Sequence, residues 1–143
     1  MGLCAGCTVT NKADYAQRVR TARQAEYDLP RDEIMEAMLT VILRGYRIER
    51  QSDAEGLVET EWADDIRAGM HRRVRVVARI EGDRPYRVAF SARAEAAKVV
   101  GGQVGAWAPT DSTRYEDELY LALHGILAKD IKPLIRGSRA AGP

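Results

Sequence analysis

Cysteine, histidine and phenylalanine are scarce in this sequence of 143 residues. Both cysteines lie within the first seven residues, so no disulfide can connect distant parts of a core. The two histidines, His71 and His124, do not form the His-Glu-x-x-His pattern that holds zinc. The longest apolar runs fall far short of the roughly 20 residues that a membrane-spanning helix needs. A net charge of +1, from 22 basic and 21 acidic residues, does not suggest a strongly basic nucleic-acid binder.

The composition is that of a soluble folded domain, with 45% hydrophobic and 30% charged residues. A helix is predicted between Pro30 and Gly45, because apolar residues recur there at steps of three and four. The period then changes to two, which predicts strands at residues 46–49, 57–62, 73–80 and 86–93. Thr113 and Glu116 have the spacing of a capping box, and they predict a second amphipathic helix that ends before Pro133.

These elements predict an α+β fold in which two helices cover one face of a four-stranded antiparallel meander. The predicted order is helix, four strands, helix, and the other sheet face is left to water or to a partner. Residues 29–131 form the predicted domain, and residues 8–28 are expected to be a polar tether, with a short helix around 15–26 as an alternative. Residues 96–112 are expected to form a loop with a short edge strand ending near Trp107, and 132–143 a disordered tail.

No group of residues points to catalysis, a cofactor or a metal. Asp64-Asp65 lies in an expected loop, and the acids at 116–118 favour the positive end of a helix dipole. The glycine-rich segment 101–105 has neither the helix nor the lysine that a phosphate-binding loop uses. We therefore expect that the protein is not an enzyme.

A row of arginines follows the outward register of the third and fourth predicted strands. Glu59 and Glu61 are expected on the same face of the neighbouring strand, where cross-strand ion pairs form. The strand aromatics, Trp62 among them, fall on the inward register, whereas RNA-binding sheets stack bases on outward aromatics. A solvated charged face is therefore favoured over a nucleic-acid surface, and contact with an acidic partner or anionic lipid stays open. The arginines of this candidate contact surface are Arg73, Arg75, Arg79, Arg87 and Arg93.

The most informative short motif is Leu3-Cys4-Ala5-Gly6-Cys7. No second cysteine pair exists to complete a zinc site, and the motif resembles the end of a bacterial lipoprotein signal, with Cys7 as the lipidated residue. A signal peptide needs a charged start and about 7–15 apolar residues, so we expect coding sequence upstream of Met1 or a trimmed leader. Two alternatives stay open: myristoylation at Gly2 with palmitoylation of Cys4 or Cys7, and a small unmodified terminus.

The cysteine motif and the polar tether are followed by four informative segments, Leu29–Leu39, Arg44–Glu49, Gly56–Trp62 and Arg73–Ile80. The order of these features resembles small envelope lipoproteins of Gram-negative bacteria. The folded part is similar to the helix-grip domains of BamC-like proteins, accessories of outer-membrane β-barrel assembly. The resemblance implies a lipid-anchored scaffold without catalytic residues, facing the periplasm, with other envelope proteins as partners and no cofactor. Thr8, where Asp would signal inner-membrane retention, implies sorting to the outer membrane.

Two other functions stay open at this level. The first is a soluble cytoplasmic module of the same fold that binds a small apolar ligand between its helices and its sheet. The second is an RNA-binding sheet surface, which predicts salt-sensitive binding through the outward arginines.

Overall fold

The alternating segments of the sequence form one open antiparallel sheet of seven strands. The structure is a computed structural model that describes the backbone of residues 3–141 and the side chains of residues 11–66 and 68–128. The order along the sheet is β1-β2-β4-β5-β6, while β3 also pairs with β4 and β7 with β5. The strands are β1 (Ile48–Ser52), β2 (Leu57–Thr60), β3 (Ala63–Arg67), β4 (Met70–Glu81), β5 (Arg87–Val100), β6 (Gln103–Val104) and β7 (Ala108–Thr110).

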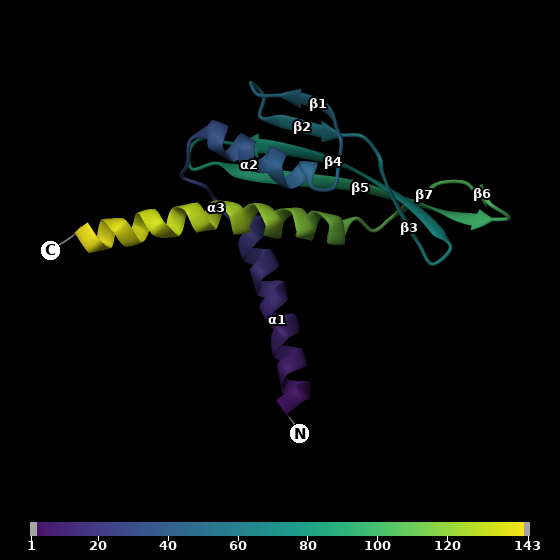
Figure 1. Cartoon of the computed structure of the whole chain (residues 1–143), viewed down its shortest axis with the longest axis horizontal. Coiled ribbons are helices and arrows are strands. Elements are labelled where there is room, and N and C mark those ends of the chain that lie inside the picture. The colour runs from purple at the N-terminus through teal and green to yellow at the C-terminus, as the bar shows by residue number, and fades with distance from the viewer. Residues whose placement is uncertain (1–2, 142–143) are drawn as a thin grey trace.

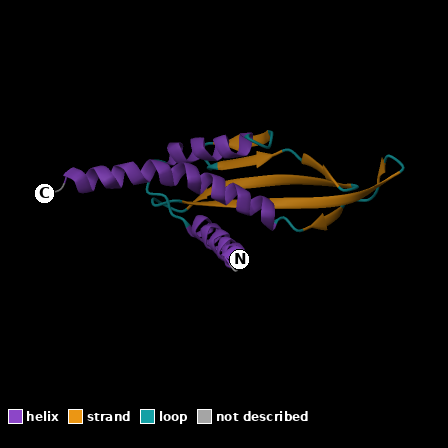
Figure 2. Ribbon diagram, turned by 60° about the horizontal axis from the view of Figure 1, so that its bottom comes forward, coloured by secondary structure: helices purple, strands orange, loops and turns teal. Residues whose placement is uncertain are grey.

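Helices α2 (Arg31–Leu43) and α3 (Thr113–Ala141) cover one face of this sheet, as the sequence predicted (Figures 1 and 2). The α+β class is therefore confirmed, but the sheet is larger than the predicted four-stranded meander. The prediction omitted β3, which has only five residues. It also placed a loop with one short edge strand at 96–112, where the structure has the end of β5, which runs to Val100, and two short strands, β6 and β7.

The core lies between these helices and the inward face of β4 and β5. Ile34, Met38 and Ile42 of α2, with Leu123 of α3, are completely buried. Burying one such side chain contributes about 1.5–3 kcal/mol, so this layer supplies most of the driving force for folding. The sheet residues that complete the core are Val58, Val74, Val76, Ala78, Ile80, Val88, Phe90 and Ala94.

Helix α1 (Leu3–Gln24) corrects the prediction that residues 8–28 form a loose tether. Apolar and polar residues are mixed around its whole circumference, so no apolar stripe revealed it. Only its last turns pack in the described part of the chain, where Val19 and Ala22 are buried and α1 contacts α3. The rest of α1 points away from the sheet (Figure 1).

The end of α1 is held to the domain by polar contacts. Arg23 donates from Nε and Nη2 to Oδ1 of Asp117 at 2.9 and 2.7 Å. Burial disfavours the charge of Arg23, but the bonds and charges of Asp117 and then Glu116 outweigh it and raise the pKa of the guanidinium. After the helix, Tyr27 and Tyr86 exchange two backbone hydrogen bonds of 2.8 and 2.9 Å. These contacts fix where α1 leaves the domain.

Helix α3 is longer than predicted, because its backbone stays helical to Ala141 instead of ending before Pro133. A proline removes one backbone hydrogen bond from a helix but does not oblige it to end. Most of the segment predicted as a disordered tail, 132–143, is therefore helical, and its last two residues lie outside the described chain.

A shift of register between β2 and β3 decides which face carries Trp62. Glu59 pairs with Val77, whereas Ala63 pairs with Val74, so one extra residue lies on the β2–β3 side of the ladder. Such a bulge turns the following side chains to the opposite face. Thr60 stays buried at the bulge, and its hydroxyl oxygen accepts a 2.8 Å hydrogen bond from the backbone N–H of Val76.

Candidate functional site on the open face of the sheet

The face of the sheet opposite α2 and α3 carries a cluster of two tryptophans and three arginines, which we call the open-face cluster. Trp62 lies here, and not on the inward register as predicted, because of the bulge after Thr60. Trp107 comes from the segment between β6 and β7. The arginines, all from β4 and β5, are Arg73, Arg75 and Arg93.

Arg73 is the centre of the open-face cluster. Its guanidinium carbon lies 4.5 Å from the ring centroid of Trp62 and 4.2 Å from that of Trp107. Both distances are within the roughly 6 Å at which a cation is attracted to an aromatic face. Nε and Nη2 of Arg73 donate to Oε1 of Glu95 at 2.8 and 2.6 Å. The Glu95 side chain is only 10% exposed, so this ion pair is partly desolvated.

Arg75 and Arg93 surround the same indole at larger distances, 5.6 and 5.9 Å from the Trp62 centroid. Arg75 forms an ion pair with Glu49 of β1. Arg93 lies 3.6 Å from Oε2 of Glu95, but its side chain is 70% exposed. Arg93 therefore offers the most accessible positive charge of the three.

The cross-strand ion pairs that were expected on this face exist, with different partners from those predicted. Glu59 lies 4.0 Å from Arg50 of β1 and not beside the arginines of β4. The carboxylates that do meet those arginines are Glu49 of β1 and Glu95 of β5.

The five predicted arginines do not act as one group. Arg79 and Arg87 lie further along β4 and β5, where both are exposed and have no ion pair within the described side chains. The sequence did not indicate that Trp107, Glu95 and His71 belong to this site. For Trp107 the reason is that nothing in the glycine-rich segment before it indicates its place in the fold. His71 contacts the Trp107 ring edge-on at 5.1 Å and lies 3.0 Å from Oδ1 of Asp64.

The remaining sequence candidates have structural roles. Glu116 accepts a 2.8 Å hydrogen bond from the backbone N–H of Ala92, which joins the start of α3 to β5. Gly101 and Gly102, both with positive φ, form the turn between β5 and β6 rather than a phosphate-binding loop. Cys7 lies within α1, but its side chain is outside the described part of the chain, so its lipidation stays a prediction. Within the described residues, no three His, Cys, Asp or Glu side chains are grouped as a metal site would require.

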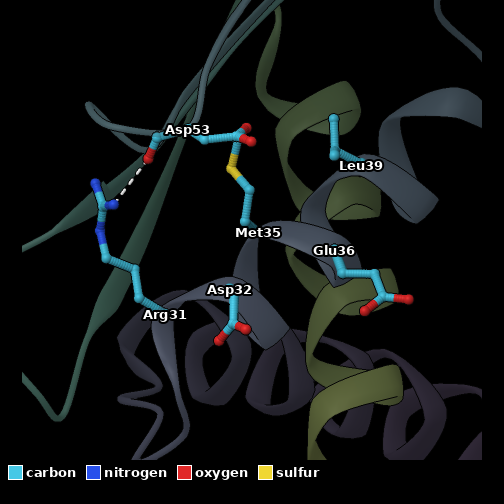
Figure 3. A pocket seen from close by; sticks show the side chains of 6 residues that line it. All are labelled: Arg31, Asp32, Met35, Glu36, Leu39 and Asp53. Atoms are coloured by element: carbon cyan, nitrogen blue, oxygen red, sulfur yellow. Dashed lines mark hydrogen bonds between the residues drawn. The ribbon is translucent and has the colours of Figure 1, made fainter.

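Two hollows flank α2. The larger, about 520 Å³, is lined by Met35 and Leu39 and by the acidic residues Asp32 and Glu36 of α2 (Figure 3). Arg31, the one cation among the described residues that line it, is occupied, because its guanidinium donates to the backbone oxygens of Asp53 and Ala54 at 2.8 and 2.9 Å. This arginine supports the β1–β2 turn and is not free for a ligand.

The second hollow, about 490 Å³, lies in the groove between α2 and α3 and is lined in part by Ala37, Ile126 and Leu127. Core side chains fill the layer between the helices and the sheet, where the alternative prediction placed a small ligand. The open-face cluster thus combines exposed charge with aromatic surface, and we take it as the candidate functional site.

Comparisons with known proteins assign no family. No protein-family model matches the chain, and no curated protein matches it either. Among the described residues, no helix is both long enough and apolar enough to cross a bilayer.

Proposed function

We propose that this chain is a non-enzymatic, lipid-anchored accessory protein of the bacterial envelope, which binds other envelope proteins through the open face of its sheet. Cys7 is the proposed acylated residue, and the outer membrane facing the periplasm is the proposed location. The motif Leu3-Cys4-Ala5-Gly6-Cys7 and the resemblance to envelope lipoproteins with helix-grip domains support the anchor. Helix α1 then separates the anchored end from the domain (Figure 1).

The observation that carries the binding role is the open-face cluster. Tryptophan and arginine are the residues most enriched at the energetic centres of protein interfaces. Here both tryptophans of the chain lie half-buried on a sheet face that no helix of the described chain covers. A partner that covered Trp62 and paired with Arg93 would bury aromatic surface and neutralise an exposed charge.

The anchor is tested by expressing the gene with its natural upstream sequence in its own host. We expect the intact mass of the membrane fraction to include diacylglyceryl and an N-acyl chain. After a wash in 0.5 M salt, which removes contacts that depend on charge, Cys7→Ala should be released into the soluble fraction, whereas the matched variant Cys4→Ala should remain in the membrane. Native protein without added mass, or release by both variants equally, would contradict the anchor.

The binding face is tested separately, by a photo-crosslinking amino acid placed at one position at a time in cells. Crosslinks to envelope proteins are expected from position 93 on the open face and not from position 43 at the end of α2. Arg93→Glu, in a protein that carries the crosslinker at position 75, should abolish these products. Equal crosslinking from positions 43 and 93 would refute the open face as the binding surface.

A second candidate function gains support from the position of Trp62 and Trp107. Single-stranded nucleic acids bind sheet faces where bases stack on aromatic rings beside cationic side chains. The readout is fluorescence anisotropy of a labelled oligouridylate at 50 and 200 mM salt. Binding that weakens with salt and is lost in Arg75→Ala and Arg93→Ala would favour this function, and no binding at 50 mM salt would exclude it.

A further inference from the structure

Exposed aliphatic side chains gather at the end of the sheet that lies beyond the helices. This distal tip comprises the end of β3, the end of β5 and β6 (Figure 1). Ile66 is 68% exposed and Val100 is 74% exposed, and Val99 and Val104 are 37% and 46% exposed. They are four of the six large hydrophobic residues that the described chain leaves exposed. A concentration of this kind marks an interaction site more often than scattered surface residues do.

Strand register places most of this apolar surface on the open face. Ile66 pairs with His71, and His71 pairs with Ala97, so these three positions share one row across the sheet. Val99 is two residues beyond Ala97 and pairs with Val104, which puts both on the same face. A hollow of about 440 Å³ beside this row is lined largely by small apolar residues, and those from the β6–β7 side are Ala106, Ala108 and Pro109.

Positive charge and tryptophans border the apolar tip. Residues 63–73 and 93–105 together hold five basic and three acidic residues, more positive than the chain as a whole. Lys98 and Arg72 are exposed at the tip, and Trp107 lies next along the open face, against His71. The aliphatic residues thus lie at the end of the sheet, and tryptophan and cations lie behind them. This arrangement is typical of proteins that bind a lipid surface, in which apolar side chains enter the lipid while tryptophans and cations contact the headgroups.

We propose that the distal tip docks onto an anionic lipid bilayer, with Ile66, Val99, Val100 and Val104 entering the headgroup region. The apolar side chains lie at the ends of strands, next to the turns that project from the sheet, and a fluid lipid surface accepts such a projecting end without a complementary partner surface. The basic excess attracts anionic headgroups at about 1 kcal/mol per cation near the surface. This contact goes beyond the proposed function, because it needs no acyl chain and orients the sheet relative to the membrane.

The test uses the full chain with Cys4→Ala and Cys7→Ala, so that no acyl group contributes. The probe is a vesicle of phosphatidylcholine alone or with 30% phosphatidylglycerol, read by flotation and by tryptophan emission. Both tryptophans of the chain lie in the open-face cluster, so their emission reports this end of the sheet. We expect a blue shift and flotation with the anionic vesicles, and at least a fivefold loss of bound protein in 0.5 M salt.

Single substitutions locate the contact. Val100→Asp and Ile66→Asp should each reduce the bound fraction at least fivefold, because they place a charge where the lipid surface would be. Leu43→Asp is the matched control, since Leu43 is 60% exposed at the end of α2, and it should bind like the parent. Circular dichroism checks that all three variants keep the parent fold.

Three results would overturn the proposal. The first is failure of the parent to bind anionic vesicles, and the second is an equal loss in Leu43→Asp. The third is a dimer, seen by light scattering and abolished by Val100→Asp, without vesicle binding; a second copy would then cover the tip. None of these results bears on acylation, because the tested protein lacks both cysteines.

Discussion

Replacing Arg73 with methionine tests whether the open-face cluster is an ordered unit. The change keeps an unbranched side chain between Trp62 and Trp107 but removes the charge, and Glu95 loses two hydrogen bonds of 2.8 and 2.6 Å. Breaking a buried ion pair from one side costs about 3–5 kcal/mol. Arg73 is 29% exposed, and Arg93 still lies 3.6 Å from Glu95, so we expect a smaller loss of about 2–3 kcal/mol.

A double-mutant cycle separates the ion pair from the packing. Glu95→Gln removes the charge that Arg73 compensates, so Arg73→Met should cost about 1 kcal/mol less in the Glu95→Gln background than in the parent. Urea unfolding at pH 7, followed by circular dichroism, gives the free energies. Tryptophan emission in the same titration reports the cluster itself, since Arg73 lies against both rings.

The matched control is Arg79→Met, an exposed arginine of the same strand without an ion pair among the described side chains. It should change the free energy of unfolding by no more than about 0.5 kcal/mol. The reasoning is refuted if Arg73→Met costs as little as Arg79→Met, or if the Arg73 and Glu95 effects add without coupling.

Three further changes probe other parts of the fold. Thr60→Val leaves the N–H of Val76 without its acceptor and should cost about 1–3 kcal/mol in urea unfolding, whereas Thr60→Ser should retain the bond. Burial raises the pKa of Tyr27 from 10.0 to about 12, so its stabilising contribution is complete below pH 10 and is lost as pH rises toward 12. Tyr27→Phe should therefore resist alkaline unfolding in this window by about 2–3 kcal/mol relative to the parent, and an unchanged alkaline slope would contradict the assignment. Arg23→Met removes the ion pair with Asp117 and should speed amide exchange in the last turns of α1, measured by mass spectrometry, while exchange in α2 stays unchanged.

Local periodicity was sufficient to predict those helices and strands that bury only one face. The apolar stripe of α2 gave its position to within a few residues, and the glycine at 45 follows its end. The alternating stretches gave the position of β4 and of the first half of β5 for the same reason, since one face of each contacts the helices. In these elements the polarity of each residue indicates whether it faces the core or the solvent, so the pairing of strands does not have to be known.

The candidate site was harder to predict, because its residues meet through pairing and not through local pattern. Trp62 follows the alternation of β2 in sequence, and only the register against β4 reveals that a bulge reverses its face. Trp107 reaches the cluster because the adjoining strand β7, with three residues, pairs with the middle of the long strand β5. Helix α1 was missed for another reason, since a helix that packs only at one end needs no apolar stripe along its length.

The way in which α1 joins the domain has a mechanical consequence. A pull on its amino-terminal end arrives first at Arg23 and at the two backbone hydrogen bonds between Tyr27 and Tyr86. These contacts lead to α3 and to the start of β5, and the pull meets them before it reaches α2, which follows in the chain. Force on α1 is therefore resisted first by the contacts of Arg23 and Tyr27, before it acts on the packing of α2 against the sheet.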